Sequence, residues 1–212
     1  MMTQIKIFTF NPFQENTFLL YDETNECIVI DAGCNEEHEF EKIDNFIEEN
    51  NLKLVSIINT HCHIDHIMGN AYLTGKYNVL SIAHKEDIPL LERANDMALA
   101  FGFNVQEPPM PGRLVNEGDE IKFGNTTLIV KHVPGHSPGS IALYNETDKF
   151  IIVGDVLFAG GIGRTDLPGG DYDTLISSIN EKLFTLDGDT IVYPGHGGKT
   201  TIAHEKSTNP FF

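Results

Sequence analysis

The sequence predicts an α/β protein made of two similar halves, each a β-sheet covered by helices. Short apolar segments typical of strands alternate with longer segments of helical periodicity along the chain. The order of several strands followed by a helix occurs twice. No low-complexity segment or linker interrupts the 212 residues, so we expect a single domain over residues 1–212.

The first half is expected to begin with three successive strands, followed by a helix. Apolar residues between Phe40 and Ile47 recur at the spacing of one helix face. A second helix is expected to start near His66, and a third to cover residues 89–103. The strands of this half are expected at residues 5–10, 16–22, 26–33, 54–60 and 78–84.

A Pro-rich turn at residues 107–112 separates the two halves. We interpret it as a loop and not as a domain boundary, because strand patterns resume directly after it. The helix of the second half is expected over residues 172–186. Its strands are expected at residues 119–133, 140–145, 149–158 and 189–196.

The composition argues against nucleic acid and anionic membranes as partners. Lys and Arg total 14 against 31 Asp and Glu, for a net charge of −17, whereas phosphate-rich partners need cations. The three cysteines form no CxxC pair, which favours a reducing compartment over a disulfide framework. No signal peptide or membrane span is visible, so a cytoplasmic location is expected.

A dense group of metal-ligand side chains follows the expected buried strand at residues 54–60. The run THCHIDH holds His61, His63, Asp65 and His66, although the whole chain has only nine histidines. Sites in layered α/β folds form at the carboxyl ends of strands. This run therefore predicts a metal site at a sheet edge. Cys62 stands between two of the candidate ligands, and we expect it to point away from them as a packing residue.

Three further strand ends offer ligands in the same way. VPGH and YPGH end at His136 and His196, and FIIVGD ends at Asp155. Pro needs no hydrogen bond in the sheet and Gly permits a sharp turn, so each histidine can be held beyond its strand.

The spacing suits two metal ions. In an extended loop His61 and His63 point the same way and can share one ion, while Asp65 and His66 can serve a second. His136 and His196 would complete the two sets, and Asp155 could bridge them. Such ligands suit zinc, with iron or manganese also possible, and a paired site generates a hydroxide nucleophile for hydrolysis.

The THxHxDH run, the PGHSPGS segment, the GD strand end and the late PGH resemble the metallo-β-lactamase superfamily, in the family's order and over nearly the whole chain. The resemblance implies a four-layer αββα sandwich with its metal site at one sheet edge. It assigns the first ion to His61, His63 and His136, the second to Asp65, His66 and His196, and the bridging position to Asp155.

Within that superfamily, LFAGGIGRTDLPGGDYDTLISSI is most similar to glyoxalase II and its compact bacterial relatives. This implies hydrolysis of hydroxyacylglutathione thioesters by a metal-bridging hydroxide, with Asp65 and Asp155 as catalytic carboxylates. Full-length glyoxalase II has a C-terminal helical domain that helps to bind glutathione. The present chain stops at Phe212, so we expect that part of the pocket to be absent or to be supplied by a second subunit of a homodimer. The identity of the thiol carrier therefore stays open.

Two other functions remain in view. THCHIDH and GRTD also resemble the iron-dependent persulfide dioxygenases of the superfamily, which use two histidines and one aspartate. A non-catalytic metal-binding or redox domain is the third possibility. The Gly after His196 matches the hydrolase pattern better than the dioxygenase pattern.

Substrate contacts are expected from the loop after Asp155 and from the region after His196. The candidates are Arg164, Asp166, Tyr172 and Lys199. For Arg164 and Asp166 we favour an ion pair that braces the loop over direct contact with substrate. Phe13, Met68 and Phe158 are either lining or core residues. The remaining histidines, expected to be ordinary surface or packing residues, are His38, His84, His132 and His204.

Overall fold

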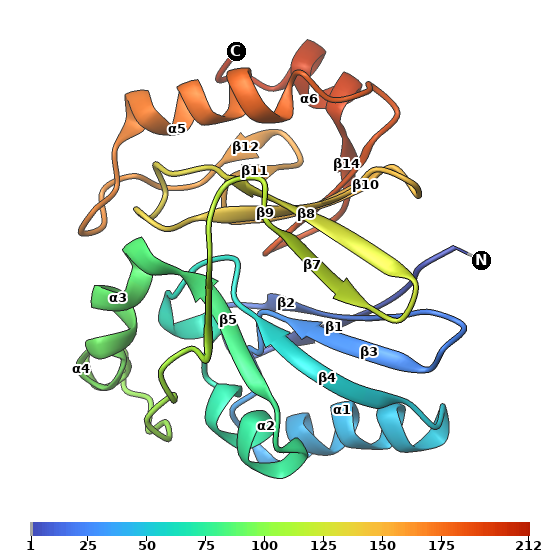
Figure 1. Ribbon diagram of the computed structural model, residues 1–212. Helices are drawn as coiled ribbons and strands as arrows, with labels where there is room; N and C mark the ends of the chain where they lie inside the picture. The colour runs from blue at the N-terminus through green and yellow to red at the C-terminus, as the bar shows by residue number, and fades with distance from the viewer. Residues whose placement is uncertain (1) are drawn as a thin grey trace.

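Two six-stranded sheets lie face to face in the middle of the structure, and helices cover the outer face of each (Figure 1). The structure is a computed structural model that describes residues 2–212. The order of layers is helix, sheet, sheet, helix, which confirms the αββα sandwich expected from the sequence.

The first sheet has the strand order β1-β2-β3-β4-β5-β6. Its first three strands pair antiparallel, whereas β3 to β6 are parallel neighbours. Parallel strands end at the same edge of a sheet, so the loops after β3, β4 and β5 lie close together. The strands are β1 (Gln4–Phe10), β2 (Glu15–Tyr21), β3 (Glu26–Ile30), β4 (Lys53–Ile58), β5 (Leu80–His84) and β6 (Arg113–Val115).

The second sheet has the order β14-β13-β10-β9-β8-β7. Because β9 is antiparallel to both β8 and β10, and β13 is parallel to β10, the strands β8, β10 and β13 run in one direction. Their carboxyl ends therefore share an edge. The strands are β7 (Glu120–Phe123), β8 (Thr126–His132), β9 (Ile141–Asn145), β10 (Phe150–Gly154), β13 (Ile191–Pro194) and β14 (Thr200–Thr201).

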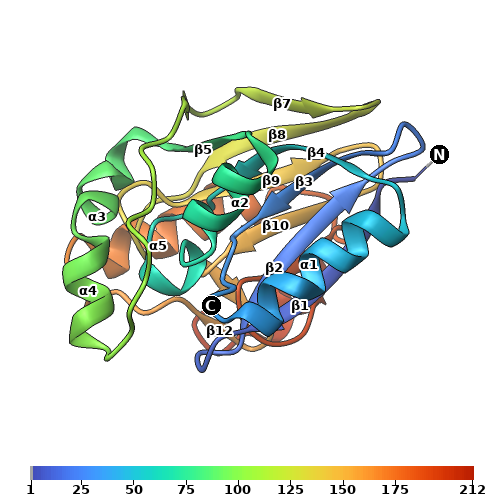
Figure 2. The ribbon, with the colours of Figure 1, turned by 90° about the horizontal axis from the view of Figure 1, so that it is seen from below.

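The helices fall into three groups. α1 (Glu37–Glu49) and α2 (Asn70–Tyr77) cover the first sheet, and α5 (Tyr172–Ser178), its π-helical continuation (Ile179–Leu183) and α6 (Ile202–Thr208) cover the second. α3 (Ile88–Glu92) and α4 (Ala94–Ala100) lie together at one end of the sandwich (Figure 2). Short 3-10 turns at Ile64–His66 and Lys85–Asp87 and a small hairpin, β11 (Leu157–Phe158) with β12 (Gly161–Ile162), complete the fold.

The main core lies between the two sheets. Ile28, Ile30 and Ile58 of the first sheet pack with residues such as Leu143 and Ile152 of the second, and all five are fully buried. Each fully buried aliphatic side chain stabilises the fold by about 1.5–3 kcal/mol relative to exposure. Burial on this scale fixes the two sheets against each other, and with them the two sets of strand ends.

Most expected elements are present, with two differences near the predicted site. The helix expected to start near His66 is delayed, because residues 64–66 form a 3-10 turn and α2 begins only at Asn70. The helix expected over residues 89–103 is two short helices, since the chain leaves helical geometry at Arg93. The turn lets Ala94 and Ala98 pack against the loop that carries Ile64. No helix within residues 2–212 is long and apolar enough to span a membrane.

Candidate metal centre

Strand ends from both sheets bring the predicted ligands to one place. The loop after β4 carries His61, His63, Asp65 and His66, while His136, Asp155 and His196 follow β8, β10 and β13. A backbone hydrogen bond links the edges of the two sheets: the amide of Ile141 donates to the carbonyl of Thr60 (2.8 Å).

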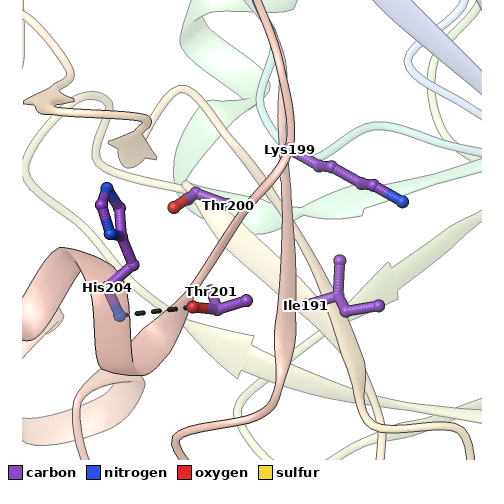
Figure 3. A pocket seen from close by; sticks show the side chains of 5 residues that line it. All are labelled: Ile191, Lys199, Thr200, Thr201 and His204. Atoms are coloured by element: carbon purple, nitrogen blue, oxygen red, sulfur yellow. Dashed lines mark hydrogen bonds between the residues drawn. The ribbon is translucent and has the colours of Figure 1, made fainter.

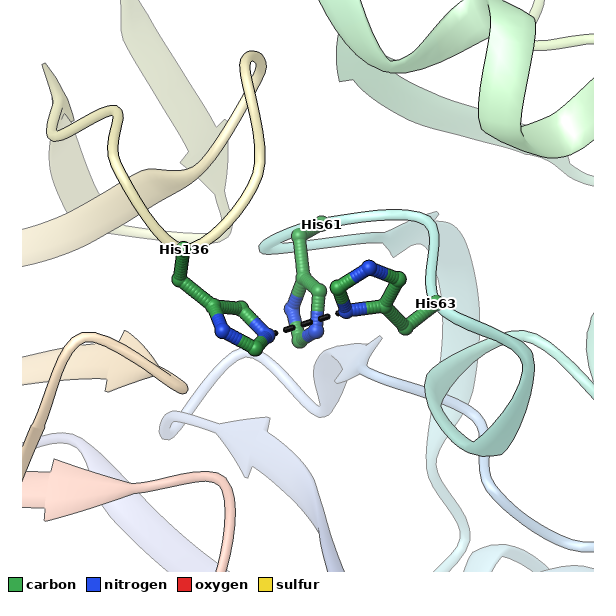
Figure 4. A group of neighbouring side chains, drawn as sticks. All are labelled: His61, His63 and His136. Carbon is green, nitrogen blue, oxygen red and sulfur yellow. Dashed lines mark hydrogen bonds between the residues drawn. The ribbon is translucent and has the colours of Figure 1, made fainter. Parts of the chain in front are cut away.

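The first group is formed by His61, His63 and His136 (Figure 4). One ring nitrogen of each residue lies within 4.8 Å of one nitrogen of each of the others. Nδ1 of His63 is 2.9 Å from Nε2 of His136. All three side chains are buried, so their nitrogens face one another and not bulk solvent.

The second group is formed by Asp65, His66 and His196. Oδ2 of Asp65 lies 3.3 Å from Nε2 of His196 and 3.6 Å from Nε2 of His66. The side chain of His66 is fully buried, and the other two are partly exposed towards a cavity.

Asp155 contacts both groups. Its Oδ1 lies 3.5 Å from Nε2 of His66, and its Oδ2 lies 3.4 Å from Nε2 of His196 and 3.8 Å from Nε2 of His136. A carboxylate in this position can give one oxygen to each of two ions.

Four of the five rings are oriented so that Nε2 faces the centre. Nδ1 of His136 donates to the carbonyl of Arg164 (2.8 Å), and Nδ1 of His196 donates to the carbonyl of Phe13 (3.0 Å). A carbonyl oxygen can only accept, so the proton must be on Nδ1. Acceptors behind a ring fix the tautomer of metal-binding histidines in this way.

Asp31 fixes the other two rings. Its Oδ2 accepts from Nδ1 of His66 (3.0 Å) and from the hydroxyl of Thr60 (2.6 Å), and that hydroxyl accepts from Nδ1 of His61 (3.1 Å). Nε2 of both rings is therefore unprotonated in the neutral tautomer.

The donor set fits cations. In residues 2–212, Nε2 of His61, Nε2 of His66 and Oδ1 of Asp155 are buried atoms without a hydrogen-bond partner. Such orphaned acceptors cost free energy unless something satisfies them. Divalent ions held by imidazole and carboxylate would do so, and the two groups with Asp155 between them fit two ions.

The pKa values of the histidines differ between the two groups. Burial, together with neighbouring imidazoles, lowers the pKa of His63 to about 4 and that of His61 well below its usual value. Burial also opposes protonation of His66, but Asp65, Asp155 and Asp31 outweigh it and hold its pKa well above the usual value. Asp155 and Asp65 likewise raise the pKa of His196 to about 10 despite burial. The carboxylates of the second group thus attract positive charge.

Two aspartates that the sequence analysis did not select hold the metal-binding loops. Asp31 is buried at the end of β3 and accepts from the amide of Thr60 (2.7 Å) in addition to the contacts above. Asp87 accepts from the amide of Cys62 (2.8 Å), the hydroxyl of Ser137 (2.8 Å) and the amide of Gly139 (2.6 Å). One carboxylate therefore ties the loop after β4 to the loop that follows His136.

The glycines of the two PGH turns are required for different reasons. Gly135 has φ +130°, and an added Cβ would lie 2.3 Å from the amide nitrogen of Leu175. A Cβ on Gly195 would lie 2.3 Å from Oδ1 of Asp155 and 2.7 Å from Cε1 of His66. A side chain at 195 would therefore occupy the space between two of the predicted ligands.

A cavity of about 230 Å³ opens beside the ligands. It is lined by Phe13, His63, Ile64, Asp65, Met97, Phe101, His136, Asp155, Arg164, Leu167 and His196. Arg164 lines the cavity and also forms the expected ion pair, with two contacts of 2.7 Å to Asp166.

The other candidate substrate residues lie elsewhere. Lys199 lines a separate pocket with Ile191, Thr200, Thr201 and His204 (Figure 3), and its ammonium is 5.9 Å from the centre of the Tyr193 ring. Tyr172 is exposed at the start of α5. Neither residue lines the cavity beside the ligands.

The packing residues are also placed. Cys62 and Met68 are buried in an apolar cluster beneath α3 and α4, as expected for Cys62. The rings of His84 and His132 stack at 4.0 Å, and Glu86 lies near both. Nδ1 of His84 accepts from an amide, and Nε2 of His132 contacts the carbonyl of Pro138, so one nitrogen of each ring is already used.

We expect the histidines to separate into two classes on substitution. His61→Ala and His136→Ala each remove one of three nitrogens of the first group and should reduce the metal content of the purified protein from two ions to one or none. His84→Ala and His132→Ala should retain both ions. Elemental analysis of the four variants checks this, and equal losses in all four would contradict the assignment.

Gly195→Ala should displace Asp155 and His66 and so lower metal content and activity together, while Gly198→Ala should change neither. The control is matched, because a Cβ on Gly198 meets nothing within 4 Å. Metal titration of both variants after removal of metal by a chelator measures the difference. Full metal affinity in Gly195→Ala would show that the space between the ligands is not needed.

Several known proteins are similar to this chain in sequence and in architecture. The model of the Metallo-beta-lactamase superfamily matches residues 10–196. The hydroxyacylglutathione hydrolase GloC of Haemophilus influenzae is 39% identical over 209 residues, which cover 98% of this chain and 97% of that protein. Among solved structures, TTHA1623 in a di-iron-bound form is 37% identical with a TM-score of 0.88, over 98% of this chain and 100% of that one. The BLEG-1 B3 metallo-beta-lactamase is 32% identical with a TM-score of 0.90, over 98% and 99%. The chain therefore belongs to the metallo-β-lactamase superfamily.

Proposed function

We propose that the protein is a metal-dependent thioester hydrolase of the hydroxyacylglutathione hydrolase type. The observation that carries the proposal is the position of Asp155, which contacts both candidate ligand groups and lines the cavity beside them. The similarity over almost the full length of a relative named as a hydroxyacylglutathione hydrolase supports the substrate class.

The ligand set supports two divalent ions, either zinc, as first expected, or iron, which the similar di-iron structure makes an equal candidate. Manganese fits the same ligands. When bound, such a pair supplies a hydroxide nucleophile near neutral pH and polarises the substrate carbonyl.

Residues of the chain orient the imidazole rings of the site and set its charge. Asp31 and the backbone carbonyls of Phe13 and Arg164 fix the imidazole rings, so ligand geometry is set before substrate binds. Although burial raises the pKa of Asp65, His66 and His196 lower it overall, so this carboxylate is ionised at neutral pH and contributes negative charge beside the second group.

The overall reaction balances without a general acid for the leaving group. Water contributes the oxygen that bonds to the acyl carbon, the carbon–sulfur bond breaks, and the products are a carboxylic acid and a thiol. A thiol has a pKa near 8.5, so it can leave as a thiolate without prior protonation.

The completeness of the second group favours a hydrolase over the persulfide dioxygenase considered above. A site with one iron needs only two histidines and one aspartate, whereas seven ligand side chains converge here. Asp65 and His196 would have no role as ligands in a site with one ion.

A cytoplasmic location is part of the proposal. Cys27, Cys34 and Cys62 are free and buried, and burial raises the pKa of the Cys27 thiol to about 12. Buried neutral thiols are typical of proteins kept in a reducing compartment.

The activity test measures S-lactoylglutathione hydrolysis and oxygen uptake with glutathione persulfide on one metal-analysed preparation. We expect close to two ions per chain and thioester turnover without oxygen uptake. One iron per chain together with oxygen consumption would replace the hydrolase by the dioxygenase.

Asp155→Asn tests the bridging position. It keeps the shape of the side chain but removes its charge, so kcat should fall at least about a hundredfold, roughly 2.7 kcal/mol of transition-state stabilisation. Melting temperature in chelator should match that of the unsubstituted protein, while the increase on adding metal should shrink.

The control for this variant is Asp189→Asn, since Asp189 is exposed and pairs with Lys149 away from the centre. This substitution should leave kcat and metal content unchanged. A fully active Asp155→Asn enzyme with two ions would mean that Asp155 is not a bridging ligand.

A further inference from the structure

The cavity beside the ligands has one apolar wall that the metal chemistry does not use. Phe13 comes from the turn between β1 and β2, and Met97 and Phe101 come from α4 and the residue that follows it. These three side chains line the same 230 Å³ as the predicted ligands. Any group bonded to a carbonyl held at the ligands lies within reach of them.

α4 is positioned to present this wall. Ala94 and Ala98 are buried against Ile64 in the apolar cluster that includes the metal-binding loop. Residues four apart share a face of a helix, so Met97 and Phe101 project together. The wall is therefore anchored to the loop that carries the ligands.

The two parts of the wall also hold each other. The ring centres of Phe13 and Phe101 are 5.6 Å apart and nearly perpendicular, and the ring of Phe103, tilted by 49°, also lies 5.6 Å from that of Phe13. Perpendicular aromatic pairs at this distance are favourable. The turn between β1 and β2 and the end of α4 thus form one surface, although they are far apart in the sequence.

This surface is left open to solvent. Phe13 is 38% exposed and Phe101 is 52% exposed. Exposed aromatic side chains that gather beside a polar site mark a place where an apolar part of a ligand binds.

The size of the cavity indicates which part of a thioester binds there. At about 230 Å³ it is smaller than the roughly 300–1,000 Å³ of pockets that enclose a drug-sized ligand. It accommodates the reacting end of the substrate, while most of a carrier as large as glutathione stays outside. The reacting carbonyl carbon bears two groups, the acyl chain and the sulfur of the carrier. The acyl chain is the smaller of the two and is the one that this cavity can enclose.

We propose, on the basis of the thioester hydrolysis proposed above, that Phe13, Met97 and Phe101 form an acyl-chain subsite. The protein then hydrolyses thioesters whose acyl group is apolar and longer than lactoyl, and it does so more efficiently than it hydrolyses short ones. The reaction is the same one: water and the acyl thioester give the fatty acid and the free thiol.

The test uses the metal-loaded protein and one series of thioesters, in which acetyl, butyryl and hexanoyl groups are carried by N-acetylcysteamine. S-lactoylglutathione is measured in parallel. We expect kcat/KM to rise about tenfold from acetyl to hexanoyl, mainly through a lower KM, because each further methylene removes apolar area from water at a half-exposed wall.

The matched variants are Phe101→Ala and Leu99→Ala. Both remove a large apolar side chain from the same exposed segment, but Leu99 is 71% exposed and does not line the cavity. Phe101→Ala should flatten the chain-length series to within about twofold, Phe101→Leu should restore most of it, and Leu99→Ala should leave it unchanged. Metal content of each variant confirms that the centre is intact.

Each outcome has one meaning. No hydrolysis of any thioester, S-lactoylglutathione included, would overturn the proposed function and this subsite with it. Hydrolysis of S-lactoylglutathione with no dependence on acyl length would leave the function standing and overturn the subsite alone. A Phe101→Ala variant that changes the elution volume on gel filtration but not the chain-length series would identify the aromatic surface as a contact between two copies of the chain.

Discussion

The centre depends above all on the carboxylate of Asp31. Its two oxygens accept from the amide and the hydroxyl of Thr60 and from Nδ1 of His66. These contacts set the exit of the chain from β4, the tautomer of His66 and, through the hydroxyl of Thr60, the orientation of His61. A single buried charge therefore links one ligand of each group. A buried carboxylate without hydrogen-bond donors is costly, and these three donors offset that cost for Asp31.

The two halves of the protein meet at this point through polar contacts added to the apolar core. Asp87 of the first half binds the loop that follows His136 of the second. The side-chain amide of Asn16 donates to the carbonyls of Pro194 and Gly197, on either side of His196. The core between the sheets brings the edges together, and these hydrogen bonds determine the register of the ligands to within the distances that coordination requires.

The convergence of the candidate ligands could be predicted from the sequence because each is placed by a local signal. A buried strand followed by His, or by Gly-Asp, leaves the side chain beyond a sheet edge whatever the rest of the fold does. Asp31 carries the same signal after β3 and could have been selected. Asp87 could not, because its role depends on contacts 25 to 52 residues away. Lys199 is close to His196 in sequence, but the chain turns at Gly197 (φ +76°) and carries it to the ring of Tyr193.

The position of the apolar cavity wall could not be predicted from the sequence, for a different reason. The helical pattern at residues 89–103 is continuous in the sequence. In the structure the chain leaves helical geometry at Arg93, Ala94 and Ala98 pack in the cluster that contains Ile64, and Phe101 lies against Phe13. The proposed chemistry and the proposed specificity of the site thus come from different parts of the fold. Strand ends fixed by the buried core supply the candidate ligands, whereas a short helix and a turn on the surface supply the wall. Under the acyl-chain subsite that we propose, substitutions in the wall change the acyl group that fits and leave the buried carboxylates in place, since none of the hydrogen bonds that orient the candidate ligands involves the side chain of Phe13, Met97 or Phe101.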